Sequence, residues 1–162
     1  MKTFNISILS ILTIALTLFA SCKKGDDEAY KPIPDAVYVT SNAVTGTGPG
    51  ASTTITNSAS GKYTVASAVA RVYVNTLKAK EVVVGFALSG TAIPGTNYTV
   101  PASNSVTIPA GKWYADIIIP VNNVVVPANR TIIVTLTSAS NNAQIGIGTD
   151  RNYKVFTYSI TP

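Results

Sequence analysis

The chain has 162 residues, with 12 Lys and Arg, 7 Asp and Glu, no His and a formal net charge of +5 at pH 7. Charged residues make up only 12% of it, and the basic ones are scattered, which argues against nucleic-acid binding because that function shows a basic stripe. With no His and one Cys, the chain lacks the usual partners of a catalytic thiol, a disulfide or a zinc site.

The N-terminal segment has the layout of a secretory signal. Lys2 precedes an apolar run over residues 6–19, and two small residues follow, as in signal peptides. The run is shorter than the about 20 apolar residues that a membrane-spanning helix needs. We therefore expect residues 1–21 to be a cleaved signal peptide.

Cys22, the only cysteine, directly follows this segment. The sequence Phe19-Ala20-Ser21-Cys22 resembles the lipobox of bacterial lipoproteins, in the relaxed form of the Bacteroidetes, with Phe19 in place of the usual Leu. The resemblance implies acylation of Cys22, and acyl chains bind a membrane with about 0.8 kcal/mol per buried CH₂. A free or removed cysteine is the alternative.

Residues 22–35 combine charge, Gly and Pro with little apolar content, which predicts an exposed, flexible linker. Asp26, Asp27 and Glu28 resemble the acidic export signal of Bacteroidetes surface lipoproteins; a plain hydrophilic tether is the alternative. The resemblance implies a lipid anchor in the outer membrane with exposure at the cell surface. The periplasmic face is the alternative location.

The remaining residues, 36–162, predict short strands separated by Gly, Pro, Asn and Ser clusters. In chain order the predicted strands are 36–40, 53–57, 61–67, 70–76, 81–90, 112–121, 130–138 and 153–160, with a Gly-rich loop over 41–52. Alternation of Val72 and Val74 with Arg71 and Tyr73 is typical of a half-buried strand. Pro120 should lie on a sheet edge, because Pro cannot donate to a ladder.

About 7–9 strands and the absence of a helix signal predict an all-β fold. We expect residues 36–162 to form one Ig-like antiparallel β-sandwich with Greek-key connections. Residues 108–111, Ile-Pro-Ala-Gly, suit a type I turn. Gly90 and Gly95 flank a loop that needs unusual dihedral angles, and Tyr98 should be a core anchor.

Residues 65–160 resemble the Calx-beta domain. The matching segments, in order and spacing, are Gly90-Thr91-Ala92, Asn97-Tyr98, Pro109-Ala110-Gly111, Ile117-Ile119 and Ile132-Leu136. The region is also similar to the small β-sandwich domains of Bacteroidetes polysaccharide-utilisation lipoproteins. Both resemblances imply a β-sandwich.

The resemblance also raises the question of calcium, which Calx-beta domains often bind through loop carboxylates. Here Asn97 stands where the family has Asp, and the loop over 121–131 has Asn122, Asn123 and Asn129 but no carboxylate. Because Ca²⁺ takes about 6–8 oxygen ligands and favours negative charge, we expect no metal site and no cofactor.

The sequence predicts no enzyme. The Gly-rich segments 46–50 and 146–150 lack the Lys-Ser/Thr of a phosphate-binding loop. Glu81 and Asp116 are the only candidate pair of glycosidase carboxylates, and each has an ordinary surface explanation.

The leading hypothesis is a non-catalytic cell-surface lipoprotein that serves as an interaction or structural module, with the membrane as a partner through Cys22. One alternative is a glycan-binding accessory protein of a polysaccharide-utilisation system. Its candidate platform is Trp113, Tyr114 and Tyr73, with Tyr63 and Tyr38 as further candidates; core packing of these rings is the competing explanation. A calcium-stabilised adhesion module is the other alternative. Besides the membrane, a glycan or another surface protein is the expected partner.

Overall fold

A computed structural model of the protein describes residues 34–41, 56–147, 150 and 152–162. The nine strands of these residues are β1 (Ala36–Ser41), β2 (Ser58–Lys62), β3 (Ser67–Val74), β4 (Val82–Ser89), β5 (Ser105–Ile108), β6 (Tyr114–Pro120), β7 (Arg130–Ala139), β8 (Gln144–Ile145) and β9 (Val155–Thr161). Cys22, the acidic residues 26–28, the loop over 42–52 and most of the strand predicted at 53–57 lie outside the described residues. Within the described part of the chain, no helix is long and apolar enough to cross a membrane.

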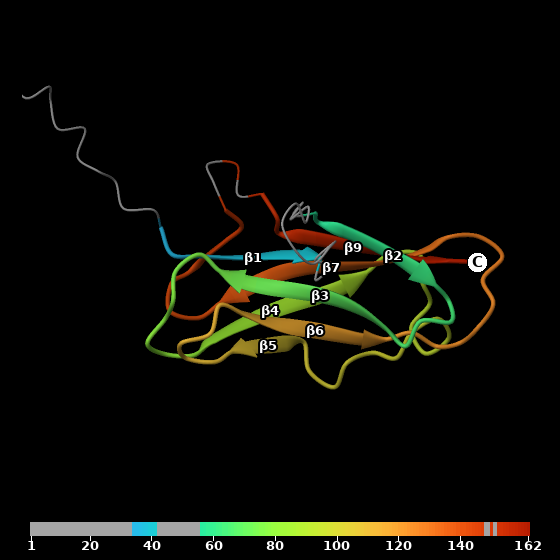
Figure 1. The fold of residues 1–162 in the computed structure, drawn as a ribbon, viewed down its shortest axis with the longest axis horizontal. Coiled ribbons are helices and arrows are strands. Elements are labelled where there is room, and N and C mark those ends of the chain that lie inside the picture. The colour runs from blue at the N-terminus through green and yellow to red at the C-terminus, as the bar shows by residue number, and fades with distance from the viewer. Residues whose placement is uncertain (1–33, 42–55, 148–149, 151) are drawn as a thin grey trace, which may run out of the picture. The chain divides into compact units, whose positions relative to one another are not determined.

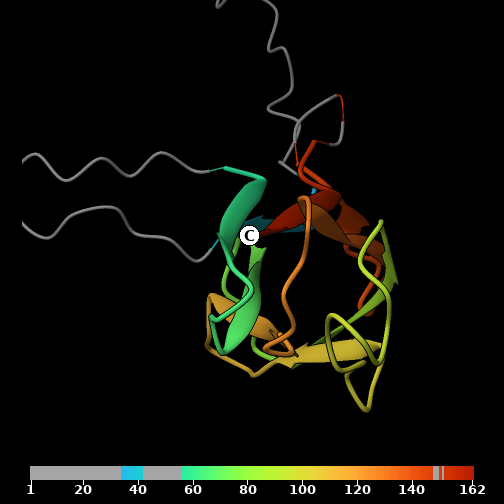
Figure 2. The same cartoon turned by 90° about the vertical axis from the view of Figure 1, so that its right-hand side faces the viewer.

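The strands form two sheets that pack face to face (Figure 1). The four-stranded sheet has the order β6-β3-β1-β8, and the five-stranded sheet has the order β2-β9-β7-β4-β5. Figure 2, seen from the end at which β4 and β6 finish, shows the two sheets enclosing a common interior. Most neighbours are antiparallel, but β1 with β8 and β2 with β9 are parallel pairs. The predicted all-β sandwich is confirmed.

Side-chain alternation builds the core. Along β3, Val72 and Val74 are buried while Arg71 and Tyr73 are half-buried on the opposite face. The same pattern buries Val82, Val84 and Phe86 of β4, Ile117 and Ile119 of β6, Ile132, Val134 and Leu136 of β7, and Phe156, Tyr158 and Ile160 of β9. Apolar burial of this kind contributes about 25 cal/mol per Å², so the inward faces of these strands hold the two sheets together.

Pro120 lies on a sheet edge, as predicted. β6 is the outermost strand of its sheet, and Pro120 is opposite Ser67. The next residue, Val121, donates its N–H to Ala66 O at 3.1 Å. Because donors alternate along an antiparallel strand, an N–H at position 120 would point away from β3. The absence of this donor therefore removes no hydrogen bond between β6 and β3. The Pro120 carbonyl accepts the N–H of Thr99 at 2.9 Å.

The strand predicted over 61–67 is wrong. The structure has β2 at 58–62, a turn at 63–66 and β3 from Ser67 onwards. β2 reads SASGK, a sequence without apolar alternation, and it is extended because β9 supplies a parallel partner along its whole length. The short strands β5 and β8 were not predicted for the same reason, since each depends on a neighbouring strand.

The turn before β6 lies one residue later than predicted. Lys112 donates its N–H to Pro109 O at 3.1 Å, so the turn spans residues 109–112. Gly111 at its third position has φ 70°, which a type II turn requires and a type I turn does not. The predictions for Gly90, Gly95 and Tyr98 are confirmed, with φ of 117° and 78° for the glycines and a side chain only 3% exposed for the tyrosine.

Candidate functional site

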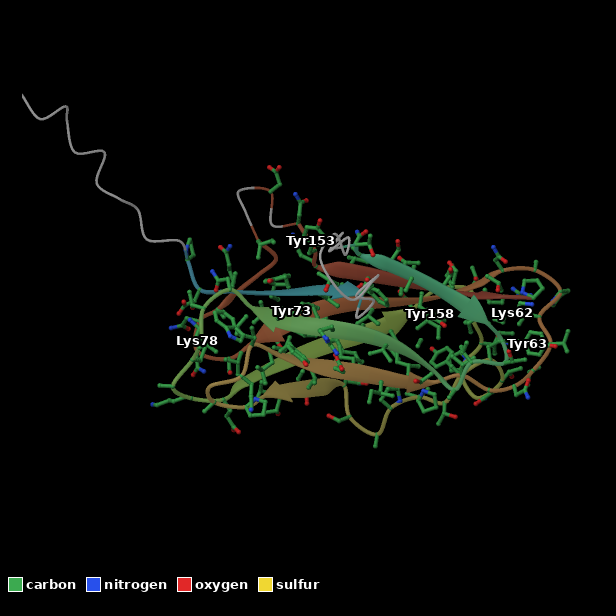
Figure 3. All side chains as sticks on the ribbon, in the orientation of Figure 1. Lys62, Tyr63, Tyr73, Lys78, Tyr153 and Tyr158 are labelled. Carbon is green, nitrogen blue, oxygen red and sulfur yellow. The ribbon has the colours of Figure 1, made fainter. Side chains whose placement is uncertain are left out.

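The outer face of the four-stranded sheet carries a row of three tyrosines. Tyr38 of β1 is opposite Tyr73 of β3, which is opposite Tyr114 of β6. The ring centroids of each neighbouring pair are 5.5 Å apart, with ring planes 13° apart for Tyr38 and Tyr73 and 53° apart for Tyr73 and Tyr114. Figure 3 labels the middle member, Tyr73. Two of the three predicted ligand-facing aromatics therefore lie together, and Tyr38 joins them.

Arg71 covers part of this tyrosine row. Its guanidinium carbon lies 3.9 Å from the centroid of the Tyr114 ring, a cation–π geometry. The same guanidinium donates to both carboxylate oxygens of Asp116, at 2.7 and 2.9 Å, and these hydrogen bonds raise the pKa of Arg71 above its ordinary value. Arg71 thus covers one face of the Tyr114 ring, while Tyr38 and Tyr73 stack on each other.

Trp113 does not belong to the tyrosine row. It precedes β6, is 50% exposed, and its carbonyl accepts the N–H of Val74 at 3.0 Å. Trp113 is therefore opposite Val74, a core residue, whereas Tyr114 is opposite Tyr73 on the outer face. Because neighbouring residues alternate between faces, the predicted aromatic set is divided between two surfaces. Tyr63 is also separate, since it packs against the core at the other end of the strands (Figure 3).

A second surface lies at the end of the sandwich at which β4 and β6 finish. We call the loops 90–100 and 121–129 together the far end. Asn122 joins the two loops: its Nδ2 donates to the carbonyls of Gly95 and Thr96 at 3.2 and 3.0 Å, and its Oδ1 accepts from the Thr99 hydroxyl at 3.1 Å. The far end is thus fixed by side-chain hydrogen bonds.

Asn97, the residue in place of the Calx-beta aspartate, is a second support of the far end. It is only 6% exposed, and its Oδ1 accepts the N–H of Ile93 at 2.8 Å. Its carbonyl accepts the N–H of Asn122 at 2.9 Å. Asn97 Oδ1 and the carbonyls of Gly95 and Thr96 thus all accept hydrogen bonds from protein donors. Among the described residues, no group of three or more His, Cys, Asp and Glu could hold a metal ion.

The far end exposes aliphatic side chains and has no charged residue in either loop. The exposed ones are Ile93 (53%), Val100 (50%), Val124 (42%) and Val125 (71%). We did not predict this surface, because an apolar run such as Val124–Val126 is more typical of a buried strand. In the structure only Val126 of that run is buried. The asparagines on both sides of the run were the one available signal for a loop.

No protein-family profile and no curated protein matches the chain. Solved structures do match it. The apo form of the Calx CBD1 domain has a TM-score of 0.56 at 16% identity, over 79% of this chain and 96% of that one. The calcium-binding domain CBD12 of CALX1.1 has a TM-score of 0.54 at 17% identity, over 64% of this chain and 41% of that one. CBD12 from CALX1.2 has a TM-score of 0.52 at 17% identity, over 64% and 40%.

This chain therefore spans nearly all of the CBD1 domain and less than half of either CBD12 structure. The likeness establishes the fold, so the Calx-beta-like sandwich predicted from the turn sequences is confirmed.

Proposed function

We propose that this chain is a non-catalytic cell-surface lipoprotein that presents a Calx-beta-like sandwich as a protein-interaction module, with the far end as its binding surface. The observation that carries the proposal is the uncharged far end, where Ile93, Val100, Val124 and Val125 are exposed on loops fixed by Asn97 and Asn122. Apolar side chains exposed together on two loops that are hydrogen-bonded to each other favour an interaction site.

The hydrogen bonds of the far end support a binding role. A loop held in one conformation loses little entropy when a partner docks, so preorganisation favours affinity. The centres of protein interfaces are depleted of charged residues, and both far-end loops have none. The expected partner is a protein with an uncharged, apolar patch.

Photo-crosslinking tests this surface directly. A photoreactive amino acid at Val125, 71% exposed, should give a discrete adduct in cells that carry the protein. The matched control is Val83 of β4, an exposed valine outside the far end. The adduct should weaken when Ile93→Asp is added to the Val125 probe. Equal labelling from both positions, or none from Val125, would contradict the proposal.

The anchoring half of the proposal rests on the signal peptide and the lipobox-like residues before Cys22. The test is incorporation of labelled palmitate into the chain and its recovery in the outer-membrane fraction. Cys22→Ser should remove both. If Asp26, Asp27 and Glu28 direct export, replacing them with alanine should protect the protein from protease added to whole cells, while palmitate labelling is unchanged. If the protein stays at the periplasmic face, the wild type is already protected.

Catalysis and calcium binding are not part of the proposal. Asp116 is engaged by Arg71, and Asp35 by Lys78, so neither carboxylate is placed as a free acid or base. The matched structures include a calcium-binding domain, but in this chain the hydrogen bonds of Asn97 and Asn122 support a structural role for the far-end loops.

Glycan binding is a second candidate, favoured by the gathering of Tyr38, Tyr73 and Tyr114 on one sheet face. A glycan array with the wild type and Tyr114→Ala tests it. Binding that is lost in Tyr114→Ala but kept in Trp113→Ala would assign sugar recognition to the row. Absence of binding in the wild type would leave the row with cross-strand packing as its role.

A further inference from the structure

A third surface lies at the opposite end of the strands, where β1 begins. We call the loops 75–81 and 109–113, with Pro34 and Asp35, the entry end; Figure 3 labels Lys78 there. We propose that the entry end docks on the anionic surface of a lipid bilayer, with Trp113 and Leu77 at the membrane interface. The inference rests on the proposed acylation of Cys22, which supplies the membrane and the short tether to it.

The point where the linker joins the sandwich is clamped to the entry end. Asn75 Nδ2 donates to Pro34 O at 2.8 Å, and Asn75 Oδ1 accepts the N–H of Ala36 at 2.8 Å. Asp35 accepts from the Thr76 hydroxyl at 3.0 Å and is ion-paired with Lys78. The hydrogen bonds from Lys78 and then Thr76 lower the pKa of the Asp35 carboxyl. Residues 34–36, where the described chain begins, are therefore held by the loop that carries Leu77.

The two loops of the entry end lie side by side. Gly111 donates its N–H to the carbonyl of Lys78 at 2.9 Å. Leu77 in one loop and Trp113 in the other are each 50% exposed. Trp is enriched at membrane–water interfaces because its ring is apolar and its N–H is polar, so this pair suits the interfacial region of a bilayer.

The entry end carries charged side chains, in contrast to the loops of the far end. Lys80 and Lys112 are exposed at the entry end, and Lys78 is paired with Asp35 there. Glu81 is the remaining carboxylate of these loops, so the entry end has a net charge of +1 from three lysines against two acids. Exposed lysines beside apolar side chains are attracted to anionic lipid head groups, whereas the far-end loops have no charge.

Because the linker is short, a weak contact with the bilayer is sufficient for the entry end to dock. Between Cys22 and Pro34 a fully extended chain reaches at most about 40 Å. An anchor at Cys22 turns docking into an intramolecular step, with an effective concentration in the millimolar range for a short flexible linker.

The chain contains one natural fluorophore and one site for chemical coupling. Trp113 is the only tryptophan and Cys22 the only cysteine. The chain over residues 22–162 is coupled through Cys22 to a maleimide lipid in vesicles of phosphatidylcholine with phosphatidylglycerol. We expect the Trp113 emission to shift to shorter wavelength, and brominated acyl chains to quench most of it. The chemical anchor makes the result independent of enzymatic acylation, which the palmitate experiment tests separately.

Matched charge reversals complete the test. Lys80→Glu with Lys112→Glu should return the Trp113 emission to that of the free protein, as should raised salt, which screens exposed charges. Lys62→Glu with Lys154→Glu, exposed lysines outside the entry end, should leave the shift intact. Unshifted and unquenched emission in the wild type, or equal loss from both double variants, would overturn the proposal.

Discussion

Arg71 of β3 and Asp116 of β6 stand directly opposite each other, and two hydrogen bonds of 2.7 and 2.9 Å join the guanidinium to both carboxylate oxygens. Their side chains are 18% and 26% exposed, so the pair is partly shielded from water and ions. The guanidinium also lies over Tyr114. This pair links the third strand to the edge strand on the outer face of the sheet.

We expect a double-mutant cycle of Arg71→Gln and Asp116→Asn to give a coupling free energy of about 1 kcal/mol, near the upper limit for exposed ion pairs because the contact is bidentate and partly shielded. Urea unfolding of the four proteins measures it. The control cycle, Asp35→Asn with Lys78→Gln, should give a smaller coupling because Asp35 is 51% exposed. A larger coupling in the control would refute the role assigned to shielding.

Gly90 should tolerate substitution much less than Gly95. A Cβ at Gly90, φ 117°, would clash with the backbone carbonyl of Thr131, whereas a Cβ at Gly95, φ 78°, meets nothing within 4 Å. We expect Gly95→Ala to lower the free energy of unfolding by about 1–2 kcal/mol, the cost of a left-handed non-Gly residue. Gly90→Ala should cost more than about 3 kcal/mol. Equal costs for the two variants would show that the Thr131 contact relaxes freely.

The inward and outward faces of the strands were predictable because apolar and polar residues alternate along each strand. Val72 and Val74 point inward and Arg71 and Tyr73 outward, as the period of two requires. Alternation does not identify the neighbouring strand, however. That Tyr38 would stack on Tyr73 depends on the register between β1 and β3, which no local pattern contains. The tyrosine row was therefore predicted only as a set of separate candidates.

Two other features show where local patterns fail. The strand that contains Pro120 was predicted to begin at residue 112, but β6 begins at Tyr114, so Trp113 lies before the strand and is half exposed. The asparagines of the far end were read as the loss of acids, whereas the structure shows what Asn97 and Asn122 hold together. A missing ligand can be seen in a sequence, but a new hydrogen bond between distant loops cannot.

Asn122 should be more important for stability than its neighbour Asn123. The Asn122 side chain makes three hydrogen bonds, to Gly95, Thr96 and Thr99, while Asn123 is exposed. We expect Asn122→Ala to lower the free energy of unfolding by about 1–3 kcal/mol and Asn123→Ala to change it by less than about 0.5 kcal/mol. Urea denaturation measures both. Similar small effects would show that the far end is not fixed by Asn122.

Millimolar Ca²⁺ should leave the melting temperature unchanged. A ligand that binds only the folded state adds RT ln(1 + [L]/Kd) to the free energy of unfolding and so raises the melting temperature. The far-end oxygens of Asn97, Gly95 and Thr96 already accept hydrogen bonds, so we expect no such binding. Differential scanning calorimetry with Ca²⁺ and with a chelator makes the measurement. A rise in Ca²⁺ that the chelator reverses would contradict the structural role of these asparagines and favour an adhesion module stabilised by calcium.

Stability should fall as the pH rises above about 10, the ordinary phenol pKa. Burial raises the pKa of both Tyr38 and Tyr158, and neighbouring Tyr73 adds to the effect at Tyr38. With folded-state values above the unfolded one, the folded protein holds these protons longer, so their stabilisation is complete below pH about 10 and is lost as the pH rises through the folded values.

The double variant Tyr38→Phe with Tyr158→Phe isolates this dependence, because it removes only the two phenol hydroxyls and leaves every other titratable side chain in place. We expect its free energy of unfolding to decline less steeply above pH about 10, while urea unfolding at pH 8 confirms that the variant is folded. Each single variant should remove part of the pH slope. Because Phe keeps the ring stacked on Tyr73, Tyr38→Phe separates the effect of the hydroxyl from the stacking of the tyrosine row. A slope as steep in the double variant as in the wild type would mean that other groups carry the alkaline loss of stability.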